Sequence, residues 1–159
     1  MLGAQIAFQT AFSGFQVVAY DINEEALQRA RERLAGLAKT YIAAHVQGAT
    51  DDTMQEAVAR IRFSADLADA AKDADLVIEA IPEILELKQS VYAKLGRVAP
   101  ERTVFATNSS TLLPSDVKDF TGRPAQFLAL HFANNIWRSN TAEVMGTSDT
   151  PRGLTYAVR

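Results

Sequence analysis

Asp75-Leu-Val-Ile-Glu-Ala-Ile-Pro82 is a short apolar run ended by a proline, and together with the segments that follow it decides the fold. Thr103-Val-Phe-Ala-Thr107 is a second run of this kind, so both are predicted to be strands. Apolar residues recur at helical spacing between them, at Leu87, Val91, Leu95 and Val98. We therefore expect a helix over Leu85–Val98 with these four residues on its buried face, and a strand-helix-strand unit of a parallel sheet.

The same alternation extends on both sides of this unit. Further strands are predicted at residues 15–22, at residues 61–64 and from Phe127, and helices at residues 24–46, 52–60 and 66–73. Apolar strands this short can be covered on both faces, which is typical of an α/β domain with a parallel sheet.

Composition excludes several classes of protein. The chain has 159 residues, of which 48% are hydrophobic and 22% charged, as expected of one globular domain. A net charge of -3 without any Lys/Arg cluster argues against a nucleic-acid surface. No Lys or Arg precedes Arg29 and no apolar run has the length of a membrane span, so we expect a soluble cytoplasmic protein. With no Cys and only two distant His residues, we expect no metal site.

Polar residues lie at or just after the ends of several predicted strands. They are Asp21, the pair Glu79 and Glu83, the run Asn108-Ser109-Ser110, and His131. Ligands of parallel sheets bind beyond the carboxyl ends of the strands, where an acidic residue can accept hydrogen bonds from a dinucleotide ribose. Each has a structural alternative: Asp21 as a cap of the helix from Glu24, and Asn108 to Ser110 as a cap of a helix near Pro114.

His131 and Glu143 are twelve residues apart in a segment predicted to be a strand, a turn and a returning strand. The fold-back would be centred near Trp137 and would set the carboxylate against the imidazole. A histidine held by a glutamate can act as a general base near neutral pH. The alternative is a histidine at a strand end that is satisfied by whatever polar group lies nearby.

The amino-terminal segment departs from a complete dinucleotide-binding pattern. Gly3 lies eighteen residues before Asp21, close to the roughly twenty that separate a glycine-rich loop from the ribose-binding acid. The simplest interpretation is that Gly3 is the third glycine and that the first strand and two glycines are absent. The helix predicted from Leu2 would then have little to pack against.

Five motifs, in order along nearly the whole chain, together resemble the NAD-binding domain of the 3-hydroxyacyl-CoA dehydrogenases. They are Tyr20-Asp-Ile-Asn-Glu-Glu-Ala-Leu27, Ala74-Asp-Leu-Val-Ile-Glu-Ala-Ile-Pro-Glu83 with Leu87-Lys88, Ala106-Thr-Asn-Ser-Ser110, Leu130-His-Phe-Ala-Asn134 and Ala142-Glu-Val144. The fold implied is a Rossmann-like, doubly wound parallel sheet, here lacking its first strand.

The resemblance also implies roles for particular residues. His131 would be the general base that takes the proton of the 3-hydroxyl group, and Glu143 would orient and polarise it. Ser110 and Asn134 would hydrogen-bond the substrate oxygen or the surroundings of the imidazole. The residues expected to line the NAD site are Gly3, Asp21, Ala80, Ile81, Glu83, Lys88 and Asn108.

The chain departs from the family in two places. Phe132-Ala-Asn-Asn135 lacks the usual Asn-Pro, which leaves the acyl chain length open. The family also has a second, all-helical domain that supplies the dimer interface and much of the acyl-CoA cleft. Because residues 151–159 do not begin a convincing amphipathic helix, we expect that domain to be absent here. The resemblance implies that the full-length form is a homodimer.

Two hypotheses for function follow. The first is NAD-dependent oxidation of a 3-hydroxyacyl-CoA to the 3-oxoacyl-CoA, or the reverse, for which the truncated chain would be inactive alone. The second is an inactive remnant or interaction module that keeps the α/β fold without catalysis, because a chain without the glycine turn lacks backbone N–H groups for the pyrophosphate.

Overall fold

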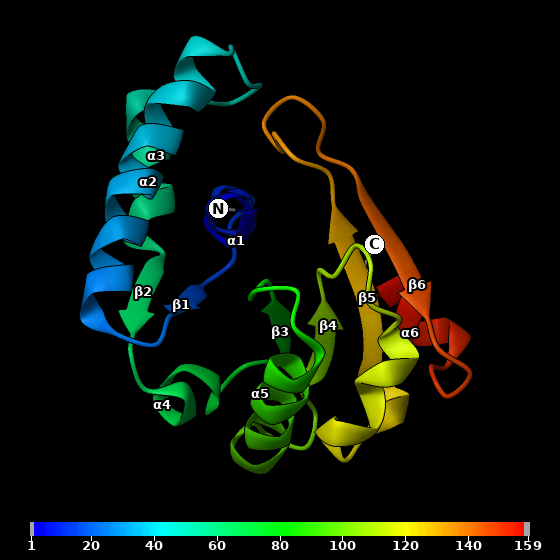
Figure 1. Cartoon of the computed structure of the whole chain (residues 1–159). Coiled ribbons are helices and arrows are strands. Elements are labelled where there is room, and N and C mark those ends of the chain that lie inside the picture. The colour runs from blue at the N-terminus through cyan, green and yellow to red at the C-terminus, as the bar shows by residue number, and fades with distance from the viewer. Residues whose placement is uncertain (1, 158–159) are drawn as a thin grey trace. The chain divides into compact units, whose positions relative to one another are not determined.

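The computed structural model describes residues 2–157 and shows an α/β chain that divides into two compact units (Figure 1). The first unit takes in the residues up to Ala70 together with Ala133–Thr141. The second unit takes in Ala71–Phe132 and the residues from Ala142 onward. Each unit has its own sheet, and the two are described separately below.

The first unit contains a two-stranded parallel sheet with helices before and between its strands. Its elements are α1 (Leu2–Phe12), β1 (Val17–Tyr20), α2 (Glu24–Ala43), α3 (Asp51–Ala59) and β2 (Ile61–Ser64), and α4 (Leu67–Ala71) leads on from it. β1 and β2 pair from Val17 opposite Ile61 to Tyr20 opposite Ser64.

Aromatic packing holds α1 in the first unit. Phe8 is fully buried, and its ring centroid lies 4.9 Å from that of Tyr41 on α2 in an edge-to-face contact. The Tyr41 hydroxyl donates a 2.6 Å hydrogen bond to Oε1 of Gln9, and burial raises the pKa of Tyr41 to about 12. The expectation that this helix would have little to pack against is therefore wrong, because α2 and α3 supply a core with Leu34 and Met54.

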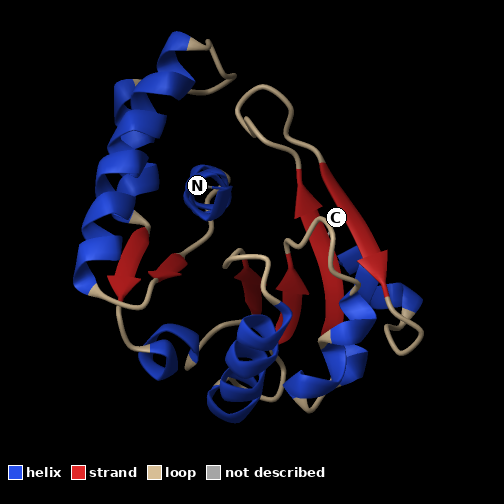
Figure 2. Cartoon of the chain, in the orientation of Figure 1, coloured by secondary structure: helices blue, strands red, loops and turns tan. Residues whose placement is uncertain are grey.

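The second unit contains a four-stranded sheet in the order β3-β4-β5-β6 (Figure 2). Its elements are β3 (Leu76–Glu79), α5 (Leu85–Val98), β4 (Val104–Thr107), the short 3-10 helices η1 (Pro114–Asp116), η2 (Lys118–Thr121) and η3 (Pro124–Gln126), β5 (Phe127–Phe132), β6 (Ala142–Gly146) and α6 (Arg152–Ala157). The first three strands are parallel and β6 is antiparallel to β5. The predicted α/β class with a parallel sheet is thus confirmed.

Successive residues of a strand point to opposite faces of a sheet, and the second unit has apolar packing on both. On one face the ring of Tyr92 on α5 makes edge-to-face contacts with Phe105 and Phe127, at centroid distances of 6.1 and 5.1 Å. On the other face Leu128 belongs to a cluster that includes Leu154 of α6. Residues Arg152–Ala157 do form a helix, α6, but it has only six residues and none of them is fully buried.

The bounds of α5 agree with the sequence prediction, but of its predicted buried face only Leu95 is fully buried. Leu87 and Val98, predicted to be buried, are 39% and 37% exposed, whereas Lys88, Tyr92 and Leu95 are buried. The face of α5 that packs on the sheet therefore includes a lysine. Lys88 can be buried there because its ammonium group pairs with Glu79 and Glu83. Hydrophobic periodicity cannot anticipate this, since it scores every lysine as exposed.

Candidate active site

His131 and Glu143 lie directly opposite each other on β5 and β6, as the predicted fold-back requires. The connection between the strands runs over Ala133–Thr141 and is centred on Trp137. Nδ1 of His131 is 3.5 Å from Oε2 of Glu143, within ion-pair range but longer than a normal hydrogen bond. The two side chains are 31% and 71% exposed.

Asn108 ties the end of β4 to the end of β5. Its backbone N–H donates to the carbonyl oxygen of Glu79 at 2.8 Å, and its Oδ1 accepts from the backbone N–H of Phe132 at 2.9 Å. The pairing of β4 with β5 stops at Thr107 opposite Ala129, so the Asn108 side chain continues the ladder beyond it. It thereby holds the backbone immediately after His131.

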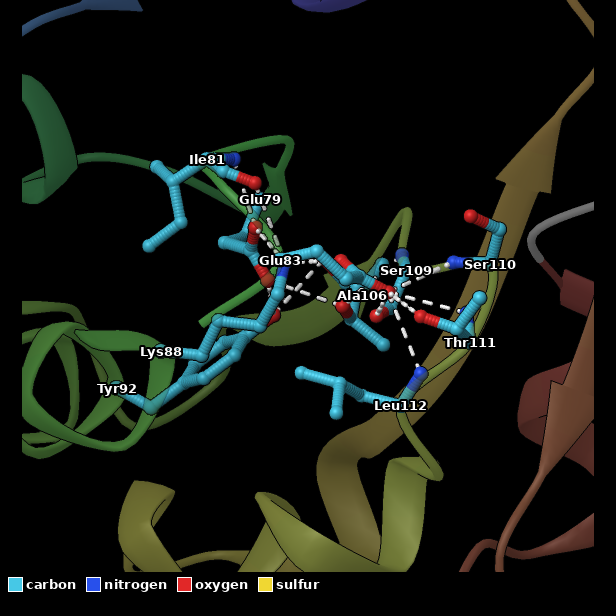
Figure 3. Close-up of polar contacts among 11 residues, drawn as sticks. Glu79, Ile81, Glu83, Lys88, Tyr92, Ala106, Ser109, Ser110, Thr111 and Leu112 are labelled. Atoms are coloured by element: carbon cyan, nitrogen blue, oxygen red, sulfur yellow. Dashed lines mark hydrogen bonds and ion pairs between the residues drawn. The ribbon is translucent and has the colours of Figure 1, made fainter. Parts of the chain in front are cut away.

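A buried ion pair lies where β3 and β4 end (Figure 3). Nζ of Lys88 is 2.6 Å from Oε1 of Glu79, and the side chains are only 1% and 2% exposed. Thr107 donates to Oε2 of Glu79 at 2.9 Å, and the backbone N–H of Ile81 donates to Oε1 at 2.8 Å. The hydroxyl of Tyr92 lies 3.4 Å from Oε2, and burial, with the Glu79 charge, raises the pKa of Tyr92 well above its usual range. A buried charge pair persists only when its remaining polar atoms are satisfied in this way.

Glu83 collects hydrogen bonds from the turn after β4 (Figure 3). Its Oε1 accepts from the backbone N–H groups of Ser110, Thr111 and Leu112 at 3.2, 3.0 and 3.2 Å. The hydroxyl groups of Ser109 and Thr111 donate to the same oxygen. A single carboxylate oxygen is thus surrounded by five donors from four consecutive residues.

The charge of Glu83 is stabilised by these donors and by Lys88, whose Nζ lies 3.2 Å from Oε2. Burial by itself would raise the pKa of the Glu83 carboxyl. Hydrogen bonds from Ser109, Thr111, Leu112 and Lys88 outweigh it and hold that pKa well below its usual range. The group therefore carries a negative charge at any ordinary pH.

The other predicted site residues of the second unit are more accessible. Ala80 and Ile81 follow β3 directly, and Ala80 is exposed. Ser110 is exposed in the turn after β4, where its backbone N–H donates to Glu83. Lys88, in contrast, is fully buried and engaged by Glu79 and Glu83. The structure thus brings His131 together with Glu143, and Glu83 together with Lys88 and the Ser110 turn.

The remaining three predicted residues lie in the first unit. Gly3 is in the first turn of α1, and Asp21 follows β1 with its carboxylate exposed. Asn23, not Asp21, caps α2 by accepting from the N–H of Ala26, so the capping role considered for Asp21 is excluded. Asn134 belongs to the Ala133–Thr141 segment, whose next residues are held by Oε1 of Gln5.

The sequence prediction missed the hydroxyl groups that complete the buried network. These are the hydroxyl groups of Thr107, Tyr92 and Thr111, whereas Ser109 was named only as part of the polar run after the strand. The available signals were the spacing of Lys88 and Tyr92 by one helical turn and the run of hydroxyl residues after β4. Within residues 2–157, no group of His, Cys, Asp and Glu is arranged to hold a metal ion, and no helix there is long and apolar enough to cross a membrane.

Comparison with protein families gives a match over residues 1–158 to the family described as 3-hydroxyacyl-CoA dehydrogenase, NAD binding domain. A probable 3-hydroxybutyryl-CoA dehydrogenase of Deinococcus radiodurans is 34% identical over 144 residues, which are 91% of this chain and 50% of that protein. The human mitochondrial hydroxyacyl-coenzyme A dehydrogenase is 33% identical over 154 residues, 94% of this chain and 49% of that protein. The chain thus spans about half the length of these curated relatives.

Solved structures give the same result. A diketoreductase, studied for dual catalysis of dicarbonyl compounds, is 60% identical with a TM-score of 0.96, over 99% of this chain and 55% of that one. The 3-hydroxybutyryl-CoA dehydrogenase of Escherichia coli is 30% identical with a TM-score of 0.89, over 98% of this chain and 32% of that one. The fold is accordingly that of Rossmann-like NAD-binding domains.

Proposed function

We propose that this chain, which belongs to the 3-hydroxyacyl-CoA dehydrogenase NAD-binding family, serves an enzyme that interconverts a 3-hydroxyacyl-CoA and its 3-oxoacyl-CoA. The observation that carries the proposal is the His131–Glu143 pair on adjacent antiparallel strands. An imidazole with one nitrogen toward a carboxylate and the other toward solvent suits proton exchange with a substrate hydroxyl group.

NAD is the cofactor of this domain, and when bound it exchanges a hydride with the substrate carbon. The residues present fit such a group. In the first unit, the exposed Asp21 carboxylate after β1 suits the ribose hydroxyl groups. In the second unit, Ala80 after β3 is exposed and has a small side chain, which suits a residue that lines a ligand. Glu83, Lys88 and Asn108 support the strand ends around them through their own hydrogen bonds.

In the proposed reaction, His131 takes the proton of the 3-hydroxyl group, or returns it in the reductive direction. Glu143 orients the imidazole and stabilises its protonated form. Ser110 hydrogen-bonds the substrate oxygen with its exposed hydroxyl, and we assign Asn134 the same kind of contact. Acid–base catalysis of this kind typically contributes about 100- to 10,000-fold.

A second candidate substrate class is favoured by the 60% identity to the diketoreductase. A 3-oxoacyl thioester is itself a dicarbonyl compound, with a ketone and a thioester carbonyl, so the two candidates share the reacting ketone. They differ in whether the CoA moiety contributes to binding. The same base, His131, would serve both.

The test uses the complete protein with NADH and one of two substrates. These are acetoacetyl-CoA and a free 1,3-diketone whose carbon chain is close in length to the acetoacetyl group. We expect turnover of the thioester, and His131→Ala should lower kcat by about 100-fold or more with little change in KM, because the base acts in the transition state. Preference for the free diketone would establish the second candidate. Turnover of neither compound would refute both and leave the inactive remnant or interaction module.

A further inference from the structure

We propose that Glu83 is a positioning residue for Ser110: its carboxylate folds the turn Ser109–Leu112 around itself and so fixes the exposed hydroxyl. This rests on the proposed function for the role of Ser110. It departs from the expectation that Glu83 serves as a cofactor-lining residue. The contacts of both carboxylate oxygens support it, since Oε1 accepts from the turn and Oε2 lies 3.2 Å from Nζ of Lys88.

The turn has no regular secondary structure of its own between β4 and η1. The N–H groups of Ser110, Thr111 and Leu112 converge on one oxygen, an arrangement that forms a concave anion-binding turn. Without the carboxylate, these three N–H dipoles would converge on a point where the chain supplies no acceptor. The conformation of Ser110 therefore depends on a negative charge at the centre of the turn.

Glu83 is itself held in place from the opposite side. Lys88 binds it and is fixed by the buried Glu79, which Thr107 at the end of β4 also contacts. The turn is thus connected through Glu83 and Lys88 to the carboxyl ends of β3 and β4. Because Glu83 is held by Lys88, its carboxylate can determine the position of the turn. A carboxylate without such a contact would adjust its own position to that of the turn.

The first experiment examines the turn in the complete protein, independently of activity. In Glu83→Ala, we expect the amide resonances of Ser110, Thr111 and Leu112 to shift and their hydrogen exchange to accelerate. Added formate, which supplies a carboxylate without the side chain, should reverse these changes saturably. Glu86→Ala, at an exposed glutamate in the first turn of α5 three residues further on, is the matched control and should change none of the three amides.

The second experiment measures activity. Glu83→Ala should lower kcat/KM by about tenfold to 100-fold, as expected when a reacting contact is misplaced, and formate should restore part of it. If Glu83 acts through Ser110, the double variant with Ser110→Ala should be no slower than Ser110→Ala alone. If Glu83→Ala does not fold, Glu83→Gln replaces it, with smaller changes expected in the same direction.

The outcomes separate this inference from the proposed function. Unchanged amides in Glu83→Ala, or in Glu83→Gln where that is used, would overturn the anchoring role whatever the enzyme turns over. Shifted amides with unaltered kcat/KM, or additive losses in the double variant, would overturn the positioning of Ser110. A wild-type protein without turnover refutes the proposed function and the Ser110 half of the inference, while the amide and formate measurements still decide whether Glu83 organises the turn.

Discussion

At the scale of single residues, the charge of Glu83 makes stability depend on pH. Its folded-state pKa lies below the ordinary 4.5, so its stabilising contribution is present above that value and is lost as the pH falls toward the folded pKa. We predict that Glu83→Gln is less stable than the wild type at pH 7 and that the gap narrows steadily below about pH 4.5. Urea unfolding at a series of pH values measures the gap. A gap independent of pH would contradict the prediction.

Asp21 allows a second prediction at this scale. Its exposed carboxylate would repel the 2′-phosphate of NADP, and neither of the next two residues, Ile22 and Asn23, offers a positive charge to hold one. The complete protein should therefore bind NADH more tightly than NADPH by at least about tenfold, or about 1.4 kcal/mol. Fluorescence titration with both compounds measures this. Asp21→Ala should reduce the preference, while Asp52→Ala, exposed on α3, should not; tighter binding of NADPH by the wild type would refute the assignment of Asp21.

At the scale of elements, α5 and η2 are in close contact at Gly96. A Cβ atom there would lie 2.2 Å from the carbonyl oxygen of Thr121, so the backbones must separate if a side chain is added. Gly96→Ala should destabilise the fold by about 1–3 kcal/mol in urea unfolding. Gly36→Ala in α2, where nothing lies within 4 Å, is the control and should stabilise by about 0.5–1 kcal/mol. Equal effects from the two substitutions would show that this contact is not tight.

Elements were predictable from the sequence where local periodicity determines them. The bounds of β2 and α5 agree with the prediction, and the fold-back of β5 onto β6 places His131 opposite Glu143 as expected. Contacts between distant residues were not predictable. Arg123, for example, donates to the carbonyl oxygens of Gly96 and Ala99 and stacks on Phe105, and no local pattern reveals such a cap. The burial of Lys88 and Tyr92 on α5 was missed for the same reason.

At the scale of the whole molecule, the resemblance supplied what periodicity could not, namely the family and the order of its motifs. Neither the resemblance nor the periodicity predicted the buried group formed by Glu79, Lys88 and Thr107. Its stability depends on side chains from two strands and a helix that meet in one place. Sequence patterns report which residues are apolar. They do not report which charges will find partners.

Open strand edges lead to a last prediction. Among the strands of residues 2–157, β1 pairs only with β2 and β3 only with β4, so each has one edge without a strand partner. Such edges can pair with another chain, and lysine side chains discourage this. The 159-residue chain should self-associate with increasing concentration in sedimentation velocity, and Val18→Lys on β1 should reduce the association. Val58→Lys on α3 is matched in exposure, 39% against 38%, but lies on a helix and should have no such effect. Equal reduction by both variants would point to general charge repulsion rather than to pairing at a strand edge.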